Sequence, residues 1–180
     1  MTFWKSFFNN KKKKQYSYYK NTQNLSKKDI LLIKNLNNKG NILNIYLSIN
    51  NNINLYELEQ LCDSVGWVRR PLKKIKIALE NSFLIACIFY YNNSQKKLIG
   101  FARATSDNSF NATIWDVVVH PEFQGQGLGR VLINQTVKQL RNYDISTITL
   151  FADPQVIKFY NHLGFIIDPD GVKGMFWYPL

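Results

Sequence analysis

The sequence is poor in cysteine and histidine, with two residues of each among 180. Cys62 and Cys87 lie far apart without a group of histidines beside them, so neither a disulfide framework nor a metal site is indicated. We expect both to be reduced core thiols in a non-oxidising compartment. Long hydrophobic runs are also missing: the longest, residues 83–91, is far shorter than the roughly 20 residues of a membrane-spanning helix. The sequence therefore predicts a soluble protein without a bound metal.

Acidic residues are scarce and unevenly placed. The net charge is +11, but residues 1–40 hold ten lysines against Asp29 alone. Residues 41–180 carry 13 basic and 11 acidic side chains, a balance of +2. With 46% hydrophobic residues the chain is globular by composition, and this nearly neutral part offers no charged face for nucleic acid. We predict a basic N-terminal arm at 1–40 and one folded domain at 41–180.

The basic arm permits two interpretations. Lysine and asparagine dominate it, which is typical of a solvated, flexible tail. Its aromatic residues, among them Phe3, Trp4 and Tyr16, leave open a contact with polyanions or an anionic membrane surface. A cleaved transit peptide is disfavoured because such peptides prefer arginine and serine.

Hydrophobic periodicity predicts an alternation of strands and helices after the arm. Apolar residues three or four apart indicate helices at 54–64, from Pro71 onward, at 128–143 and at 154–162, the last closed by Gly164. Alternating or β-branched stretches indicate seven strands, at 42–49, 83–91, 98–105, 113–119, 146–151, 165–167 and 174–178. The order predicts a mixed sheet with helices on it, one parallel crossover and no second domain.

The most informative stretch is a strand that leads through a glycine loop into a helix. Val117, Val118 and Val119 end the strand, and three glycines follow in Gln124-Gly125-Gln126-Gly127-Leu128-Gly129-Arg130. A glycine loop that ends in a helix N-terminus gathers unpaired amide N–H groups at the positive end of the helix dipole. Such an arrangement is suited to a phosphate or pyrophosphate.

Two familiar phosphate loops do not fit these glycines. A nucleoside-triphosphate loop requires Lys and Ser or Thr after the last glycine, where this chain has Arg130 and Val131. A dinucleotide fold requires Gly-x-Gly-x-x-Gly, and the spacing here is Gly-x-Gly-x-Gly.

The loop resembles the Q/R-x-x-G-x-G/A signature of the GCN5-related N-acetyltransferase (GNAT) superfamily, which binds the pyrophosphate of acetyl-CoA. Stretches at 61–67, 99–107, 110–116, 150–153, 159–165 and 174–179 are similar to its plastid branch. That branch includes a protein encoded in red-algal plastids and chloroplast serotonin/lysine N-acetyltransferases of plants. The resemblance covers residues 54–180.

This resemblance implies a GNAT fold, with a mixed, mostly antiparallel twisted sheet of about seven strands, flanking helices and a parallel crossover at the acetyl-CoA site. Main-chain amides of residues 124–130 would hold the pyrophosphate, and the backbone of residues 117–119 would pair with pantetheine. Amides at Val117 or Val119 would also face the thioester carbonyl. Arg130 could add a charge for a phosphate or be a solvated helix residue.

The acceptor amine must lose a proton before it attacks, since an aliphatic ammonium has a pKa of about 10. Asp153, Asp116, Glu122 and His120 are the candidate bases. Asp153 is preferred because it follows a strand at its C-terminal edge, although it could equally be a helix N-cap. His120 is more typical of a turn.

Tyr160 follows Asp153 by two helical turns, so both can address one cleft. It matches the tyrosine that protonates the coenzyme thiolate in the superfamily, and the alternative is a core tyrosine. Acceptors suggested by the resemblance are arylalkylamines such as serotonin, and protein lysine or N-terminal amines.

Aromatic residues could line a pocket for an aryl amine or simply pack the sheet: Trp67, Phe110, Trp115, Phe176, Trp177 and Tyr178. A non-catalytic acyl-CoA sensor that keeps the fold is the alternative function. We expect a plastid stromal protein, either monomer or homodimer.

Overall fold

The computed structural model describes residues 29–49 and 53–178, which fall into two compact units. The first unit runs to Phe151 and the second begins at Ala152. The predicted arm lies largely outside the described residues.

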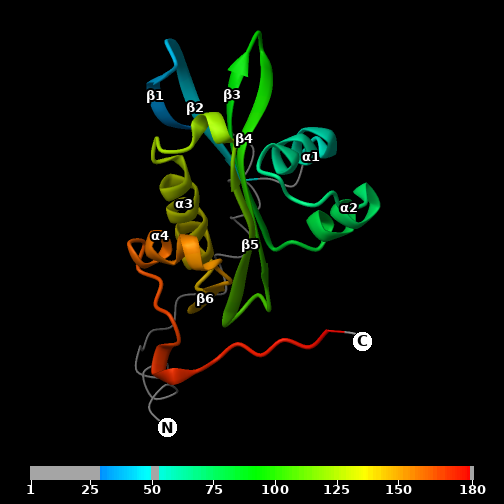
Figure 1. Cartoon of the computed structure of the whole chain (residues 1–180), viewed down its shortest axis with the longest axis vertical. Coiled ribbons are helices and arrows are strands. Elements are labelled where there is room, and N and C mark those ends of the chain that lie inside the picture. The colour runs from blue at the N-terminus through cyan, green and yellow to red at the C-terminus, as the bar shows by residue number, and fades with distance from the viewer. Residues whose placement is uncertain (1–28, 50–52, 179–180) are drawn as a thin grey trace. The chain divides into compact units, whose positions relative to one another are not determined.

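Six strands in the described residues form one mixed sheet in the order β1-β2-β3-β4-β5-β6 (Figure 1). Neighbours from β1 to β5 are antiparallel, and β6 pairs in parallel with β5. The predicted mixed, mostly antiparallel sheet with one parallel crossover is confirmed. The strands are β1 Ile30–Asn38, β2 Asn41–Ile49, β3 Leu84–Asn92, β4 Gln95–Ser106, β5 Asn111–Val119 and β6 Thr147–Leu150.

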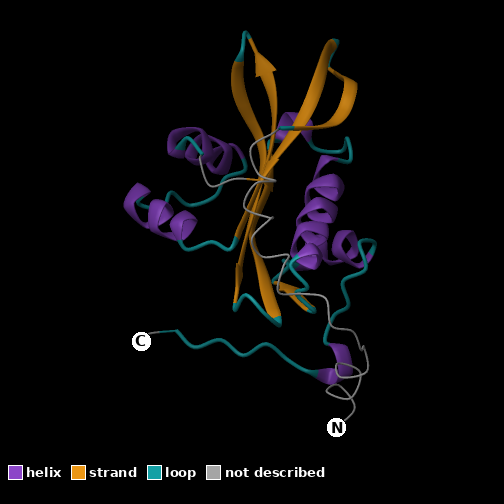
Figure 2. Cartoon of the chain, turned by 180° about the vertical axis from the view of Figure 1, so that it is seen from behind, coloured by secondary structure: helices purple, strands orange, loops and turns teal. Residues whose placement is uncertain are grey.

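Helices cover both faces of this sheet (Figures 1 and 2). The helices α1, Leu55–Ser64, and α2, Leu72–Glu80, lie on one face, and α3, Leu128–Asn142, lies on the other. The Asn54 side chain caps α1 by accepting the N–H of Tyr56 at 3.0 Å. Each amphipathic helix buries its apolar stripe against the sheet, so the central strands are covered on both sides.

Two hydrophobic clusters result, one on each face. The first, on the α3 side, contains buried residues of β2, β3 and β4 together with Phe123, Leu128 and Leu132. The second, on the α1 and α2 side, contains Phe101 of β4 and Val118 of β5. The loop that carries the glycines is therefore anchored at both ends, by Phe123 before it and Leu128 after it.

The sheet begins earlier than the charge distribution predicted. β1 pairs along its length with β2, so the boundary expected between residues 40 and 41 falls inside a hairpin. The strand was missed because it is an edge strand with lysine and asparagine on exposed positions, a composition that edges tolerate.

The two last predicted strands, at 165–167 and 174–178, are wrong. Asp168 and Asp170 have φ values of 44° and 56°, so the chain between the two segments is a turn in the left-handed region. Met175 and Trp177 are almost fully exposed. Alternating apolar residues mark where a strand can form, but a strand also requires a hydrogen-bonded neighbour.

The second unit is built from short helices. A 3-10 turn at Pro154–Val156 leads into α4, Ile157–Asn161, and Gly164 follows with a φ of 90°, the left-handed conformation predicted for a helix end. No helix in residues 29–49 and 53–178 is long and apolar enough to cross a membrane.

Candidate acetyl-CoA site

The parallel ladder between β5 and β6 is shorter than β5 itself. Pairing runs from Asn111 opposite Thr147 to Ile114 opposite Leu150, and β5 then continues to Val119. The backbone of residues 115–119 therefore lies beside a gap where β6 is absent. This leaves the main-chain groups on that side of residues 115–119 without a β6 partner.

A β-bulge sits where the gap begins. Trp115 pairs with Arg103 and Val118 pairs with Phe101, so two residues of β5 oppose one of β4. The first of them, Asp116, has a φ of 53°. The resulting left-handed conformation is uncommon for a residue other than glycine, although aspartate tolerates it.

The bulge decides which amides face the gap. The N–H of His120 donates to the Ile99 carbonyl of β4 at 2.8 Å. Because backbone groups alternate along a strand, Val118 also faces β4, whereas Val117 and Val119 face the gap. The Gln124 side chain donates from Nε2 to the Val119 carbonyl at 2.9 Å, on the gap side. Of the three valines predicted to bind the coenzyme, Val118 thus directs its amide to β4.

The glycine loop follows a 3-10 turn at Pro121–Phe123. Gly125 and Gly127 have φ values of 74° and 81°, and a Cβ at either would meet no atom within 4 Å. These positions therefore require glycine for its backbone conformation, with open space beside them.

Gly127 is also the N-cap of α3, and no side-chain hydrogen bond caps the helix. The Val131 amide is the first one bonded back to Gly127, at 3.1 Å. The amides of Leu128, Gly129 and Arg130 precede it, where a helix lacks internal partners. They lie at the positive end of the dipole, which is suited to an anion.

Side chains of the loop are directed to the protein. Leu128 is buried, the Gln124 amide binds Val119, and the Gln126 side chain binds Asn38. Gln124 and Arg130 are exposed, and Arg130, in the first turn of α3, has the one charged side chain of residues 124–130 that could approach a phosphate. Whatever the loop binds, it presents mainly backbone amides.

Two of the predicted bases are held in ion pairs. Asp116 accepts from Arg103 Nε at 2.6 Å and from Arg70 Nη1 at 3.1 Å. Glu122 accepts from Lys39 Nζ at 2.8 Å, and this contact lowers the pKa of the Glu122 carboxyl. Lys39 stabilises the charged form of Glu122, which makes Glu122 a weaker proton acceptor. Both oxygens of Asp116 are occupied by the two arginines.

His120 is a turn residue, as its position predicted. Its Nδ1 accepts the N–H of Glu122 at 3.3 Å, which caps the 3-10 turn. The other ring nitrogen, Nε2, remains for a ligand.

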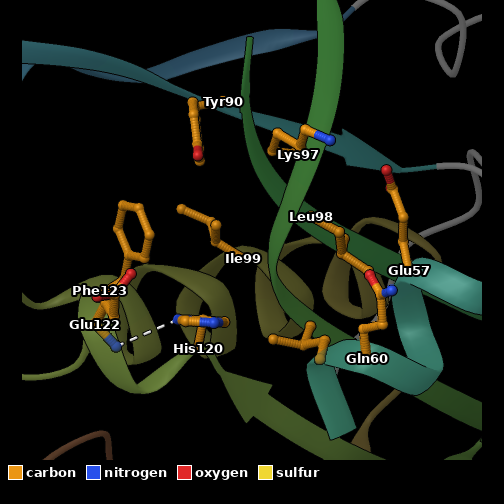
Figure 3. Close-up of a pocket in the computed structure, with 10 residues that line it drawn as sticks. Glu57, Gln60, Tyr90, Lys97, Leu98, Ile99, His120, Glu122 and Phe123 are labelled. Carbon is orange, nitrogen blue, oxygen red and sulfur yellow. Dashed lines mark hydrogen bonds between the residues drawn. The ribbon is translucent and has the colours of Figure 1, made fainter. Parts of the chain in front are cut away.

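His120 and Glu122 line a pocket of about 220 Å³ beyond the end of β5 (Figure 3). The remaining walls come from α1, β3, β4 and the turn: Glu57, Gln60, Leu61, Tyr90, Lys97, Leu98, Ile99 and Phe123. None of the valines or glycines of the predicted site lines this pocket. It is therefore separate from the β5 gap and the helix N-terminus.

Asp153 and Tyr160 lie together in the second unit. Burial raises the pKa of Tyr160, and the negative charge of Asp153 raises it further. Asp153 occupies the N-cap position of the 3-10 turn, but its side chain makes no capping hydrogen bond. The carboxylate is therefore left for another role, and the tyrosine stays protonated at neutral pH.

An aromatic pair stands where the β5–β6 ladder ends. Trp115 and Phe151, the residues next after the last paired positions, have ring centroids 5.4 Å apart. The indole Nε1 donates to Thr105 Oγ1 at 2.9 Å, which fixes the ring. Trp115 is among the aromatic residues that the sequence suggested for a pocket, and Phe151 is not. Nothing in the sequence around Phe151 indicates that its ring stacks on Trp115.

Other candidate aromatics are exposed to different degrees. Trp67 is 37% exposed and Phe110 61%, and in the second unit Trp177 is 85% exposed. Phe176 and Tyr178 stack on each other with centroids 6.5 Å apart. None of these five side chains is buried, so the alternative that they pack in the interior of the sheet is wrong for them.

Comparison with known proteins gives a consistent family. Residues 52–165 match the acetyltransferase (GNAT) family. The chain is 64% identical, over all of both chains, to a protein named uncharacterized N-acetyltransferase ycf52 from Gracilaria tenuistipitata var. liui. It is 50% identical to GCN5-related N-acetyltransferase 2, chloroplastic, of Arabidopsis thaliana, over 78% of this chain and 60% of that one.

A solved structure shares the fold. A probable acetyltransferase from meticillin-resistant Staphylococcus aureus superposes with a TM-score of 0.61 at 21% identity, over 74% of this chain and 99% of that chain. The fold, the glycine loop and the family match agree. The chain is an N-acetyltransferase and belongs to the acetyltransferase (GNAT) family.

Proposed function

We propose that this chain transfers an acetyl group from acetyl-CoA to a primary amine by direct attack in a ternary complex. The observation that carries the proposal is the adjacency of two sets of open amides. Val117 and Val119 face the gap in the sheet, and the uncapped N-terminus of α3 begins nine residues after Val119. The first set is suited to a thioester and its pantetheine arm, the second to a diphosphate.

The residues present fit acetyl-CoA as co-substrate. Main-chain amides in the loop Gln124-Gly125-Gln126-Gly127 and in Leu128, Gly129 and Arg130 would hold the diphosphate, with open space beside the glycines. No group of three or more potential metal-binding side chains occurs in the part of the chain that the structure describes. The proposed reaction requires none, because amide dipoles stabilise the negative charge that develops on the carbonyl oxygen.

The proton transfers are assigned to Asp153 and Tyr160. Asp153 would accept the proton from the acceptor ammonium, either directly or through water. The neutral amine then attacks the thioester carbonyl, the carbon–sulfur bond breaks, and Tyr160 would protonate the departing thiolate. The proton that the nitrogen loses as the amide forms would return to the Tyr160 oxygen, directly or through water. The raised pKa of Tyr160 keeps its hydroxyl available as a donor at neutral pH.

The acceptor is proposed to be an arylalkylamine such as serotonin, with protein lysine or N-terminal amines as the other class. The stacked pair Trp115–Phe151 at the mouth of the gap favours the aryl amine, since an aromatic ring can pack on it. The relatives named above, one of them chloroplastic, support a location in the plastid stroma.

Release of free CoA in the presence of an amine panel tests this function. The panel contains serotonin, tryptamine, a lysine peptide and a peptide with a free N-terminus, each with acetyl-CoA. We expect amine-dependent CoA release, fastest with the aryl amines. Binding of acetyl-CoA without CoA release for any amine would instead support the acyl-CoA sensor. The Tyr160→Phe variant, assayed with the same amines, measures the CoA release that does not depend on the proposed acid.

A further inference from the structure

The tip of the β1–β2 hairpin is a tightly fixed turn. Lys39 and Gly40 have φ values of 52° and 87°, so both central residues of the two-residue loop are in the left-handed region. This pattern is typical of the hairpin turns that match strand twist. The Gly40 N–H donates to Asn37 Oδ1 at 3.0 Å, which holds the turn from within.

Two hydrogen bonds join this tip to the residues around the glycines. Lys39 Nζ donates to Glu122 Oε1 at 2.8 Å, and Gln126 Nε2 donates to Asn38 Oδ1 at 2.8 Å. Gln126 lies between the two left-handed glycines. Figure 1 shows the hairpin and the start of α3 at the same end of the sheet.

Burial distinguishes the second contact from an ordinary surface bond. Asn38 is 7% exposed, and Oε1 of Gln126 is buried with no hydrogen-bond partner among the described residues. Burying an amide whose oxygen is unpaired costs free energy. The side chain nevertheless points toward the hairpin, and hydrophobic residues of β1 pack against the cluster that holds Phe123 and Leu128.

A loop with several glycines loses much conformational entropy when it is ordered. Contacts that order it before the ligand arrives reduce that loss and strengthen binding. The hairpin supplies such contacts, and it lies outside residues 52–165, where the family match falls. Its role is therefore additional to the glycine loop that the family shares.

We propose that the hairpin tip is a positioning element for the phosphate-binding loop. Asn38 and Lys39 hold residues 122–126 in the conformation that presents the loop amides to a diphosphate, without touching the ligand themselves. This inference rests on the proposed function, because it assumes that the loop binds the CoA diphosphate.

Calorimetric titration of the full-length chain with CoA tests the inference. We expect Gln126→Ala to weaken CoA binding about tenfold, as expected when one well-formed hydrogen bond to the loop is lost. The KM for acetyl-CoA should rise by a similar factor. Lys34→Ala removes an exposed lysine from the same hairpin away from the tip, and should bind CoA like the wild type.

Charge reversal separates positioning from direct contact with the ligand. Lys39→Glu should weaken CoA binding, and adding Glu122→Lys should restore most of it, because the ion pair is rebuilt in the opposite sense. Failure of the double variant to recover binding, with Glu122→Gln binding normally, would show that Lys39 acts on the ligand and would overturn the inference.

The wild type provides the reference that separates the two claims. If it binds CoA and Gln126→Ala binds equally well, the positioning role is wrong and the proposed function stands. If the wild type does not bind CoA at all, the proposed function fails and this inference fails with it. Melting temperature, measured on every variant, reports whether the fold is intact.

Discussion

Arg103 Nε donates to Asp116 Oδ2 at 2.6 Å, and the aspartate it holds is the left-handed residue of the β5 bulge. The two side chains are 15% and 18% exposed, so the pair is partly protected from water. Arg70, from the connection between α1 and α2, binds the other carboxylate oxygen at 3.1 Å. The geometry makes Asp116 a clamp for the bulge, and the bulge directs Val117 and Val119 to the gap.

Substitution of Asp116 distinguishes a clamp from a general base. Asparagine tolerates the left-handed backbone but cannot accept the proton. If Asp116 only fixes the bulge, the turnover of Asp116→Asn should therefore be within about fivefold of the wild type. Asp116→Val disfavours the bulge and should lose about a hundredfold in kcat, the scale seen when an oxyanion donor is removed. Steady-state kinetics on both variants distinguishes the two roles. An equal loss of kcat in the two variants would support Asp116 as the general base.

Removal of the Tyr160 hydroxyl should slow chemistry without weakening coenzyme binding. We expect Tyr160→Phe to lower kcat by roughly a hundredfold, typical of losing a positioned acid, with CoA affinity unchanged. Tyr143→Phe removes a hydroxyl in the first unit, where the ring packs on Phe83, and should leave kcat intact. Full turnover of the Tyr160 variant would eliminate its assignment as the acid.

The same substitution at two glycines separates backbone strain from ligand binding. Gly127 and Gly164 have φ values of 81° and 90°, and a Cβ at either position meets no atom within 4 Å. Alanine at each should cost roughly 1–2 kcal/mol in the free energy of unfolding. Only Gly127→Ala should also weaken CoA binding in a calorimetric titration. Loss of binding in both, or in neither, contradicts the role of the loop.

The turn between β4 and β5 should make the free energy of unfolding depend on pH in the acid range. Asp107 accepts the N–H groups of Asn111, Ser109 and Phe110, and these bonds, with the Asn111 backbone bond strongest, lower its pKa from 3.8 to about 2. Its folded pKa lies below its unfolded pKa, so its stabilisation is complete above about pH 4 and is lost as the pH falls toward about 2.

Asp107→Asn keeps an oxygen acceptor for these amides but has no proton to gain. The difference in free energy of unfolding between wild type and variant should therefore narrow as the pH falls through that window. Urea unfolding at a series of pH values measures it. A difference that stays constant down to about pH 2 would mean that the turn does not bind the Asp107 carboxylate in its charged form.

Local patterns carried most of what the sequence predicted correctly. α3 begins at Leu128 as its periodicity indicated, and Asn54 caps α1 where the helix was expected. The crossover was predictable because a strand, a glycine loop, a helix and a strand follow one another along the chain. Each of these features depends on neighbours a few residues away.

Features that depend on distant partners were missed. The bond between Gln126 and Asn38 joins residues 88 positions apart, and β1 was hidden by its lysines and asparagines. The bulge at Asp116 follows from strand register, which no spacing in β5 reveals. Asp116 was therefore considered as a base, whereas the structure pairs it with two arginines.

Main-chain amides in the glycine loop after β5 and at the start of α3 are proposed to bind the diphosphate of acetyl-CoA. Calorimetric titration of the wild-type chain with CoA, and in parallel with pantetheine, which lacks the diphosphate, tests it most directly. We expect saturable heat with CoA and a far weaker response with pantetheine. Equal binding of both compounds, or no heat with CoA at millimolar concentration, would contradict it.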